Sequence, residues 1–214
     1  DGFDIFGLTL YSQYAGGDYY DFLCDEAEPG RLCVAIGDVS GHGVDSGLIM
    51  MMAQTSILSK VCNNGSCGPS EMLDAINGII RENITRLGSD HYMTMMALRL
   101  NATHLTVAGK HQDLIIYRSA LNRTETITIP GTWLGISEDI KKGLKDVDVQ
   151  IDRGDIVLLF TDGITEATNP QGEMYGQPRL EQALNAYADL PVGKLRDRII
   201  GDVNAFQEEQ MDDM

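Results

Sequence analysis

The sequence of 214 residues predicts an α+β fold in which two antiparallel sheets are flanked by helices. Three observations indicate this fold class. The length fits one domain, many short apolar runs have strand character, and the helical runs come in two separate pairs. Strands and helices that are segregated along the chain favour α+β over the alternating pattern of a parallel sheet.

Short apolar runs bounded by turn residues predict the strands. Residues 3–14 alternate apolar and polar side chains, and residues 19–24 and 32–37 flank an acidic turn that contains Pro29 and Gly30. This pattern predicts a first strand and then a hairpin. Further strands are predicted at residues 92–100, 104–108, 114–118, 125–129, 147–151 and 156–161.

Four segments with helical character separate or follow these strands. Residues 44–61 are long and apolar without strand alternation, which predicts a buried helix. Ser70 is predicted to open a second helix, with Glu71 in its first turn and apolar residues at helical spacing up to Leu87. The last third of the chain is predicted to form helices at residues 178–187 and 191–207.

The charge balance limits the possible partners. The chain has 16 Lys+Arg and 32 Asp+Glu, a net charge of −16. Such a chain repels phosphate backbones and anionic membrane surfaces, so we expect no nucleic acid and no membrane partner. The most apolar helical run, residues 48–53, is far shorter than the roughly 20 residues of a membrane span. Bound metal ions or a basic partner fit the charge better.

Cysteine usage and the first residues predict a cytoplasmic protein. Residues 1–4 lack the positive charge of a signal peptide. Cys24 and Cys33 flank the predicted hairpin and could face each other, but the cysteines have no zinc-ribbon spacing. We therefore expect all four to be free thiols, namely Cys24, Cys33, Cys62 and Cys67.

Three aspartates lie at the edges of predicted strands and next to glycine. Asp18 follows Gly17, Asp38 ends an apolar strand, and Asp162 ends another and precedes Gly163. A carboxylate in such a position is partly desolvated and unfavourable unless it is paired or bound to a cation. Pairing partners are scarce, because the basic residues before Arg99 are only Arg31, Lys60, Arg81 and Arg86.

Oxygen ligands without a thiolate or histidine set favour Mg²⁺ or Mn²⁺ over zinc. Two such ions about 3.5–4 Å apart would activate a water molecule and neutralise a phosphate. From the residues alone another interpretation stays open, in which Asp18 caps a turn and Asp38 caps the helix that begins near Gly43.

Four motifs, three of which contain these aspartates, span nearly the whole chain. They are Gly16-Gly17-Asp18-Tyr19-Tyr20-Asp21, Gly37-Asp38-Val39-Ser40-Gly41-His42-Gly43, Thr161-Asp162-Gly163-Ile164-Thr165-Glu166-Ala167 and Asp212-Asp213-Met214. Supporting motifs are Tyr92-Met93-Thr94, Ala108-Gly109-Lys110-His111, Leu134-Gly135-Ile136 and Gly154-Asp155. Taken together, and in their order along the chain, the motifs resemble those of the SpoIIE/RsbU-like bacterial branch of the PPM metal-dependent Ser/Thr protein phosphatases.

The resemblance implies an α-β-β-α sandwich with two Mn²⁺ or Mg²⁺ ions at the edge of the sheets. By analogy, Asp38 bridges the two ions and the Val39 carbonyl is a further ligand. Asp162 and Asp212 bind the second ion, and Asp18 binds the first, directly or through water. Asp38 and Asp162 are thus the expected catalytic residues, and the attacking group is a metal-bridging hydroxide. Asp21 and Asp213 are expected in the outer shell.

The sequence departs from the family's pattern in three places. His42 stands four residues after Asp38, where eukaryotic relatives have a histidine two residues after the metal aspartate, so we expect it to position the loop. No Arg or Lys precedes Arg31, which leaves Lys110 as a candidate phosphate contact. The family's last motif continues into a closing strand, and we expect that strand to be missing from a chain that ends at Met214.

The resemblance implies a single phosphatase domain over residues 1–214, the output domain of a longer protein with an upstream sensory or receiver module. The expected substrate is a small anti-anti-sigma-type (STAS-like) protein phosphorylated on Ser or Thr. A homodimer is compatible with the apolar helix at residues 44–61. The alternative is a catalytically silent domain that binds a signalling partner. Trp133 is expected to pack in the fold, with a role as an aromatic substrate anchor as the alternative.

Overall fold

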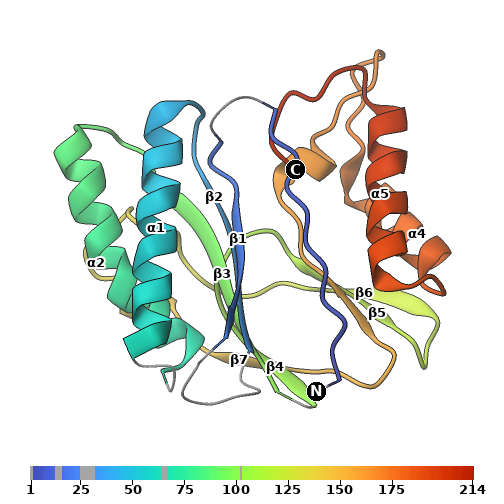
Figure 1. Cartoon of the computed structure of the whole chain (residues 1–214), viewed down its shortest axis with the longest axis horizontal. Helices are drawn as coiled ribbons and strands as arrows, with labels where there is room; N and C mark the ends of the chain where they lie inside the picture. Colours follow the sequence, from blue (N-terminus) through green and yellow to red (C-terminus); the bar gives the residue numbers. More distant parts are fainter. Residues whose placement is uncertain (1, 13–15, 25–31, 64–66, 102) are drawn as a thin grey trace. The chain divides into compact units, whose positions relative to one another are not determined.

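The computed structural model describes residues 2–12, 16–24, 32–63, 67–101 and 103–214. The chain divides into two compact units. The five-stranded unit comprises residues 14–111 and 129–151, and the three-stranded unit comprises residues 1–13, 112–128 and 152–214. Each unit contains one antiparallel sheet and its own helices, which confirms the predicted α+β class (Figure 1).

The five-stranded unit has the strand order β1-β2-β3-β4-β7. All neighbouring strands are antiparallel, and the helices α1 and α2 pack against one face of the sheet (Figure 1). The strands are β1 (Tyr19–Cys24), β2 (Leu32–Val39), β3 (Met93–Leu100), β4 (His104–Lys110) and β7 (Val147–Gln150). The helices are α1 (Val44–Asn63), α2 (Pro69–Leu87) and the short 3₁₀ turn η1 (Lys141–Gly143).

Side-chain alternation assigns the two faces of this sheet. Ala35 and Val39 of β2 and Met93 and Met95 of β3 pack in one core with α1 and α2, and we call this side the helix face. Residues between them in the sequence, such as Asp38, point to the opposite face, because successive side chains of a strand alternate. The helices contribute buried apolar residues at helical spacing, namely Ile49, Ala53, Ile57, Met72, Leu73, Ile76, Ile80 and Ile84.

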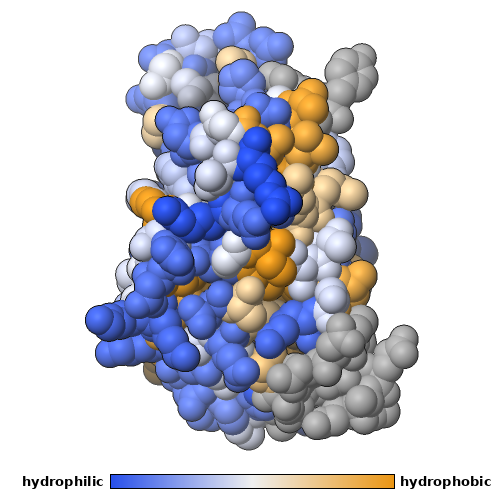
Figure 2. All heavy atoms as spheres, turned by 90° about the vertical axis from the view of Figure 1, so that its left-hand side faces the viewer, coloured by the Kyte–Doolittle hydropathy of each residue, from blue (hydrophilic) through white to orange (hydrophobic). Residues whose placement is uncertain are grey.

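The other side of α1 exposes several large apolar residues. Figure 2, which faces the side of the molecule that carries α1 and α2, shows hydrophobic residues among the polar surface. The exposed apolar residues of α1 are Val44, Leu48, Met51 and Leu58. Helix α1 is therefore only partly buried, although the sequence predicted a buried helix. In the described part of the chain, no helix has the length and apolarity needed to cross a membrane.

Helix α2 begins one residue earlier than predicted. Gly68 is its N-cap and provides no side-chain cap, and Pro69 is its first residue. The Ser70 amide donates a hydrogen bond to the Asp146 carboxylate (2.8 Å). A carboxylate at a helix N-terminus accepts a hydrogen bond from a free amide and interacts favourably with the positive end of the helix dipole. The capping group therefore comes from 76 residues away and not from Ser70.

The three-stranded unit contains β5 (Leu114–Arg118), β6 (Arg123–Ile127) and β8 (Ile156–Leu158) in the order β6-β5-β8. Its helices are α3 (Asp162–Thr165), α4 (Gly176–Tyr187) and α5 (Val192–Phe206). Their shared core includes Ile115, Phe160, Leu180, Leu184, Leu195, Ile199 and Val203. The predicted strand 156–161 is wrong beyond Leu158, because the pairing with β5 ends at Ile115.

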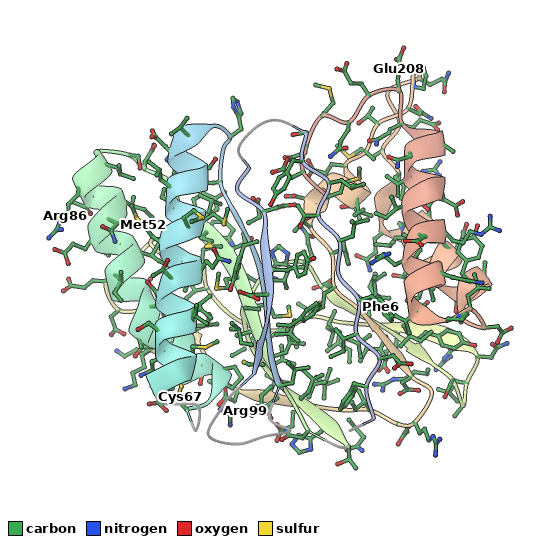
Figure 3. The ribbon with its side chains drawn as sticks, in the orientation of Figure 1. Phe6, Met52, Cys67, Arg86, Arg99 and Glu208 are labelled. Carbon is green, nitrogen blue, oxygen red and sulfur yellow. The ribbon has the colours of Figure 1, made fainter. Side chains whose placement is uncertain are left out.

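The predicted strand over residues 3–14 is also wrong for residues 3–12, and residues 13–14 lie outside the described residues. Among the described residues of this segment, Leu10 makes a ladder-like pair, in which its amide and carbonyl both bond to Met214 (2.7 and 3.0 Å). The rest of the segment is held by side chains. Phe6, labelled in Figure 3, lies against Gly193, with the Arg196 guanidinium 6.0 Å from its ring centre.

Candidate functional site

Asp18 and Asp38 lie opposite each other on neighbouring strands. The β1–β2 register pairs Tyr19 with Gly37, and the Val39 amide donates to the Gly17 carbonyl (3.2 Å). Continuing this register by one residue places Asp18 opposite Asp38. Directly opposed side chains have Cβ atoms about 4.5–5.5 Å apart, and two carboxylates at that distance repel each other. Asp18 is 7 % exposed, so water screens this repulsion weakly.

Gly17 brings the backbone of β1 unusually close to this aspartate. A Cβ atom on Gly17 would lie 2.6 Å from the Val39 carbonyl oxygen and 2.8 Å from Oδ1 of Asp38. Both distances are too short for a side chain, so only glycine fits. The Val39 carbonyl oxygen and Oδ1 of Asp38 thus both lie beside Gly17.

Thr94 supports Asp38 from the next strand. The β2–β3 register pairs the two residues, and the Thr94 hydroxyl donates to the Asp38 carbonyl oxygen (3.2 Å). The same hydroxyl is 2.8 Å from Nδ1 of the buried His111. Thr94 thus connects the His111 ring to the backbone of β2. This chain of hydrogen bonds fixes the backbone at Asp38.

The three-stranded unit holds the other predicted ligands. Asp162 begins α3, and its pKa is raised by burial and by the negative charge of Asp212. The pKa of Glu166, four residues on, is raised by burial and then by Asp162 and Asp212. Three carboxylates therefore influence each other here. Glu166 is not among the site residues that the sequence predicted, although its helical spacing from Asp162 could have indicated it.

Asp213 fixes the segment that carries Asp212. Its buried carboxylate accepts hydrogen bonds from the Ser12 amide (2.8 Å) and the Ser12 hydroxyl (3.1 Å). The Asp213 carbonyl oxygen also packs on Gly163, where a Cβ atom would lie 1.8 Å from it. Asp212 itself is exposed, and its carboxylate accepts the amide of Asp213 (2.9 Å).

The other predicted residues lie at the margins. Asp21 is three residues after Asp18 and hence on the opposite face of β1. There the pKa of Tyr19 is raised, first by burial of Tyr19 and then by the negative charge of Asp21. His42 is exposed in the loop before α1. Lys110 is half-buried at the end of β4 and pairs with Met95. The structure therefore brings Asp18 together with Asp38, and Asp162 with Asp212.

The donor chemistry fits hard divalent cations. Carboxylate and carbonyl oxygens are the ligands that Mg²⁺ and Mn²⁺ prefer, and both aspartate pairs carry repelling charges that a cation would relieve. Across residues 2–12, 16–24, 32–63, 67–101 and 103–214, no group of three His, Cys, Asp or Glu side chains converges to hold a metal ion. The pairs are described separately in their own units.

The comparisons with known proteins agree with the motifs. The family model for Stage II sporulation protein E (SpoIIE) matches residues 28–214. Phosphoserine phosphatase RsbU of Bacillus subtilis is 25 % identical over 216 residues, which cover 100 % of this chain and 61 % of that protein. Protein IcfG of Synechocystis is 26 % identical over 199 residues, which cover 79 % of this chain and 30 % of that protein. The chain thus spans less than two thirds of these relatives.

Solved structures show the same fold. The SiaA-PP2C domain of Pseudomonas aeruginosa has a TM-score of 0.80 at 20 % identity, covering 96 % of this chain and 82 % of that one. The PP2C phosphatase domain of SpoIIE from Bacillus subtilis, with a fragment of its regulatory domain, has a TM-score of 0.72 at 16 % identity, covering 96 % and 60 %. With the family match over most of its length, the chain belongs to the Stage II sporulation protein E (SpoIIE) family, the SpoIIE/RsbU-like branch of the PPM (PP2C-type) phosphatases.

Proposed function

We propose that this chain is a metal-dependent protein serine/threonine phosphatase in bacterial signalling. The observation that carries the proposal is the opposed pair Asp18 and Asp38, with the Val39 carbonyl beside it at Gly17. Membership of the SpoIIE family and the likeness to a phosphoserine phosphatase support it. The substrate would be a small STAS-like protein phosphorylated on Ser or Thr.

The proposed ligand set takes residues from both units. Asp18, Asp38 and the Val39 carbonyl would hold one part of a two-ion site, and Asp162 and Asp212 the other. When bound, Mn²⁺ or Mg²⁺ would lower the pKa of water and neutralise the phosphate. The motif resemblance supports this ligand set, and the repulsion within each pair supports a cation at each pair.

The chain's own residues would then position the reacting groups. The Thr94–His111 hydrogen bonds would keep Asp38 in place, and Ser12 would hold Asp213 and hence Asp212. Glu166 would add negative charge beside Asp162 and Asp212, and His42 is a candidate for phosphate contact. Asp21 and Lys110, which the sequence predicted near the site, lie opposite Ala35 and Met95 and so belong to the helix face, away from Asp38. We also propose that this domain acts in the cytoplasm, under control of an upstream sensory or receiver module and as a possible homodimer.

The test is hydrolysis of an aryl phosphate by protein stripped of metal, with and without added Mn²⁺. We expect turnover only with Mn²⁺, and a loss of at least about 100-fold in both Asp38→Ala and Asp162→Ala, since each removes a ligand of the same centre. Asp189→Ala, at an exposed position between α4 and α5, is the matched control and is expected to keep its rate. Two results would contradict the joint centre. One is turnover in the presence of a chelator, and the other is a loss of turnover in only one of the two variants.

A further inference from the structure

The only tryptophan of the chain stacks on a tyrosine beside Asp38. The rings of Tyr92 and Trp133 are nearly parallel, with centroids 4.6 Å apart and an interplanar angle of 15°. Trp133 nevertheless stays 38 % exposed. A stacked aromatic pair that stays partly exposed is a rigid apolar surface, and binding to it costs little side-chain entropy.

Strand pairing places this pair on the same face of the sheet as Asp38. Met93 and Leu134 exchange two backbone hydrogen bonds (3.0 and 2.8 Å), and both side chains are buried on the helix face. Their neighbours Tyr92, Thr94 and Trp133 therefore point to the opposite face, as Asp38 does.

The register then gives an approximate distance. Thr94 lies opposite Asp38 on β2, and the antiparallel Met93–Leu134 bridge places Trp133 opposite Thr94 on the other side. Asp18, Asp38, Thr94 and Trp133 thus form one row across four neighbouring backbone segments. Since neighbouring segments are about 4.8 Å apart, the Cα atoms of Asp38 and Trp133 are separated by roughly 10 Å.

Hydrogen bonds hold the aromatic pair in this position. The Ser40 amide donates to the Tyr92 carbonyl (2.9 Å), and the Tyr92 amide donates to the Ser40 hydroxyl (3.0 Å). The loop of Trp133 is fixed by Asn77, which accepts the Gly135 amide (2.9 Å), and by Arg81, which donates to the Gly135 carbonyl (3.3 Å). The pair is therefore tied both to the loop after Asp38 and to α2.

The loop that carries Trp133 is itself uncharged, although the chain has a net charge of −16. Residues 131–136 contain no ionisable side chain, and Ile136 in the same loop is 50 % exposed. An apolar group can therefore pack here without losing the hydration of a charge. An extended chain advances about 3.3–3.6 Å per residue, so a residue two or three positions from a group at Asp38 reaches Trp133.

We infer that Tyr92 and Trp133 form an aromatic shelf that binds an aliphatic side chain two or three residues from the phosphorylated residue of the substrate protein. This inference rests on the proposed phosphatase function. Trp133 then determines which phosphoproteins are dephosphorylated efficiently, whereas the carboxylates act on any phosphate monoester that reaches them.

The test uses two phosphoserine peptides that differ only in having leucine or alanine at the second and third positions on both sides. We expect the wild-type protein with Mn²⁺ to favour the leucine peptide about tenfold in kcat/KM, as expected for partial burial of an aliphatic side chain. Trp133→Ala should abolish this preference. Trp133→Phe should retain most of it, which separates loss of the shelf from loss of the fold. Leu121→Ala, at another exposed apolar residue, is the matched control and should keep it.

A second measurement does not depend on turnover. Because Trp133 is the only tryptophan, all tryptophan fluorescence of the chain comes from the shelf. With Asp38→Asn, we expect the leucine peptide to change the emission at a concentration about tenfold lower than the alanine peptide. Two results would overturn the shelf. One is a fluorescence change at the same concentration of both peptides, and the other is a leucine preference in kcat/KM that survives in Trp133→Ala. Absence of aryl phosphate hydrolysis would overturn the proposed function, and the fluorescence result would still decide the shelf.

Discussion

At the residue scale, the candidate site is defined by carboxylates whose charges repel each other in partly buried positions. Asp18 faces Asp38 across two strands, and burial and the charge of Asp212 raise the pKa of Asp162. Such an arrangement makes the metal-free protein less stable than it would otherwise be. A bound cation relieves the same repulsion, so the metal affinity and the metal-free stability are linked.

The raised pKa of Asp162 predicts how the stability of the Asp162→Asn variant, relative to wild type and with a chelator present, depends on pH. Between the unfolded pKa of about 3.9 and the higher folded pKa, the folded protein binds more protons, so its stability falls as the pH rises. Asp162→Asn removes the charge and should therefore be more stable than wild type at pH 7. The difference should vanish at and below about pH 4, where Asp162 of the wild type is protonated.

Urea unfolding at both pH values, with Asp189→Asn as the control for net charge, checks this expectation. A variant that is less stable than wild type at pH 7 would show that the charge of Asp162 is compensated within the metal-free protein.

At the element scale, short contacts at glycine join segments that are distant in the sequence. Gly163 in α3 packs on the Asp213 carbonyl, and Gly17 packs on the Val39 carbonyl and Asp38. In both places a glycine follows or precedes one of the predicted ligands. These contacts fix where the elements end, and hence where the aspartates lie.

The contact at Gly163 predicts a large effect of a single methyl group. Gly163→Ala would place Cβ 1.8 Å from the Asp213 carbonyl oxygen, so the end of the chain has to move. We expect a loss of about 2 kcal/mol or more in the free energy of unfolding and a weaker Mn²⁺ response. Gly201→Ala is the matched control.

Gly201 lies inside α5 with open space around its Cα atom. Its replacement by alanine should raise stability by roughly 0.5–1 kcal/mol, because alanine has the higher helix propensity. Thermal and urea unfolding measure both variants, and equal effects would mean that the short contact at Gly163 does not constrain the fold.

At the scale of the whole molecule, the predicted ligands are divided between the two units. Asp18 and Asp38 belong to the five-stranded unit, and Asp162 and Asp212 to the three-stranded unit. Residues near both chain ends meet within the three-stranded unit, through the bonds of Leu10 with Met214 and of Ser12 with Asp213. The structure thus keeps Asp212 in place although it stands near the last residue.

If one metal centre uses both units, Mn²⁺ should stabilise the molecule only when both aspartate pairs are intact. At about 100 times the dissociation constant, binding contributes about 2.7 kcal/mol, which corresponds to a rise in Tm of roughly 5–10 °C for a chain of this size. We expect Asp38→Ala and Asp162→Ala each to abolish this rise, and Asp189→Ala to keep it. Calorimetry with and without Mn²⁺ measures the shifts. A full rise in either aspartate variant would mean that one unit binds the metal alone.

The sequence determined most of the elements and the identity of the aspartates. The strands at Tyr19–Cys24 and Leu114–Arg118 agree with the prediction at both ends, and the four predicted helices agree within a few residues. The short helices α3 and η1 were not predicted. Apolar periodicity is a local property, so it can be recognised without knowing what an element packs against. The motifs around Asp18, Asp38 and Asp162 are local in the same way.

Only the tertiary structure decided the features that depend on distant partners. Residues 3–12 have the alternation of a strand, but a ladder needs a neighbouring backbone, and within the described chain the backbone pairing of this segment is that of Leu10 with Met214. Asp146 caps α2 from 76 residues away. The row from Asp18 through Asp38 and Thr94 to Trp133 follows from strand register, which no single segment encodes. The sequence therefore provided the chemical groups, and the pairing of strands decided which of them face each other.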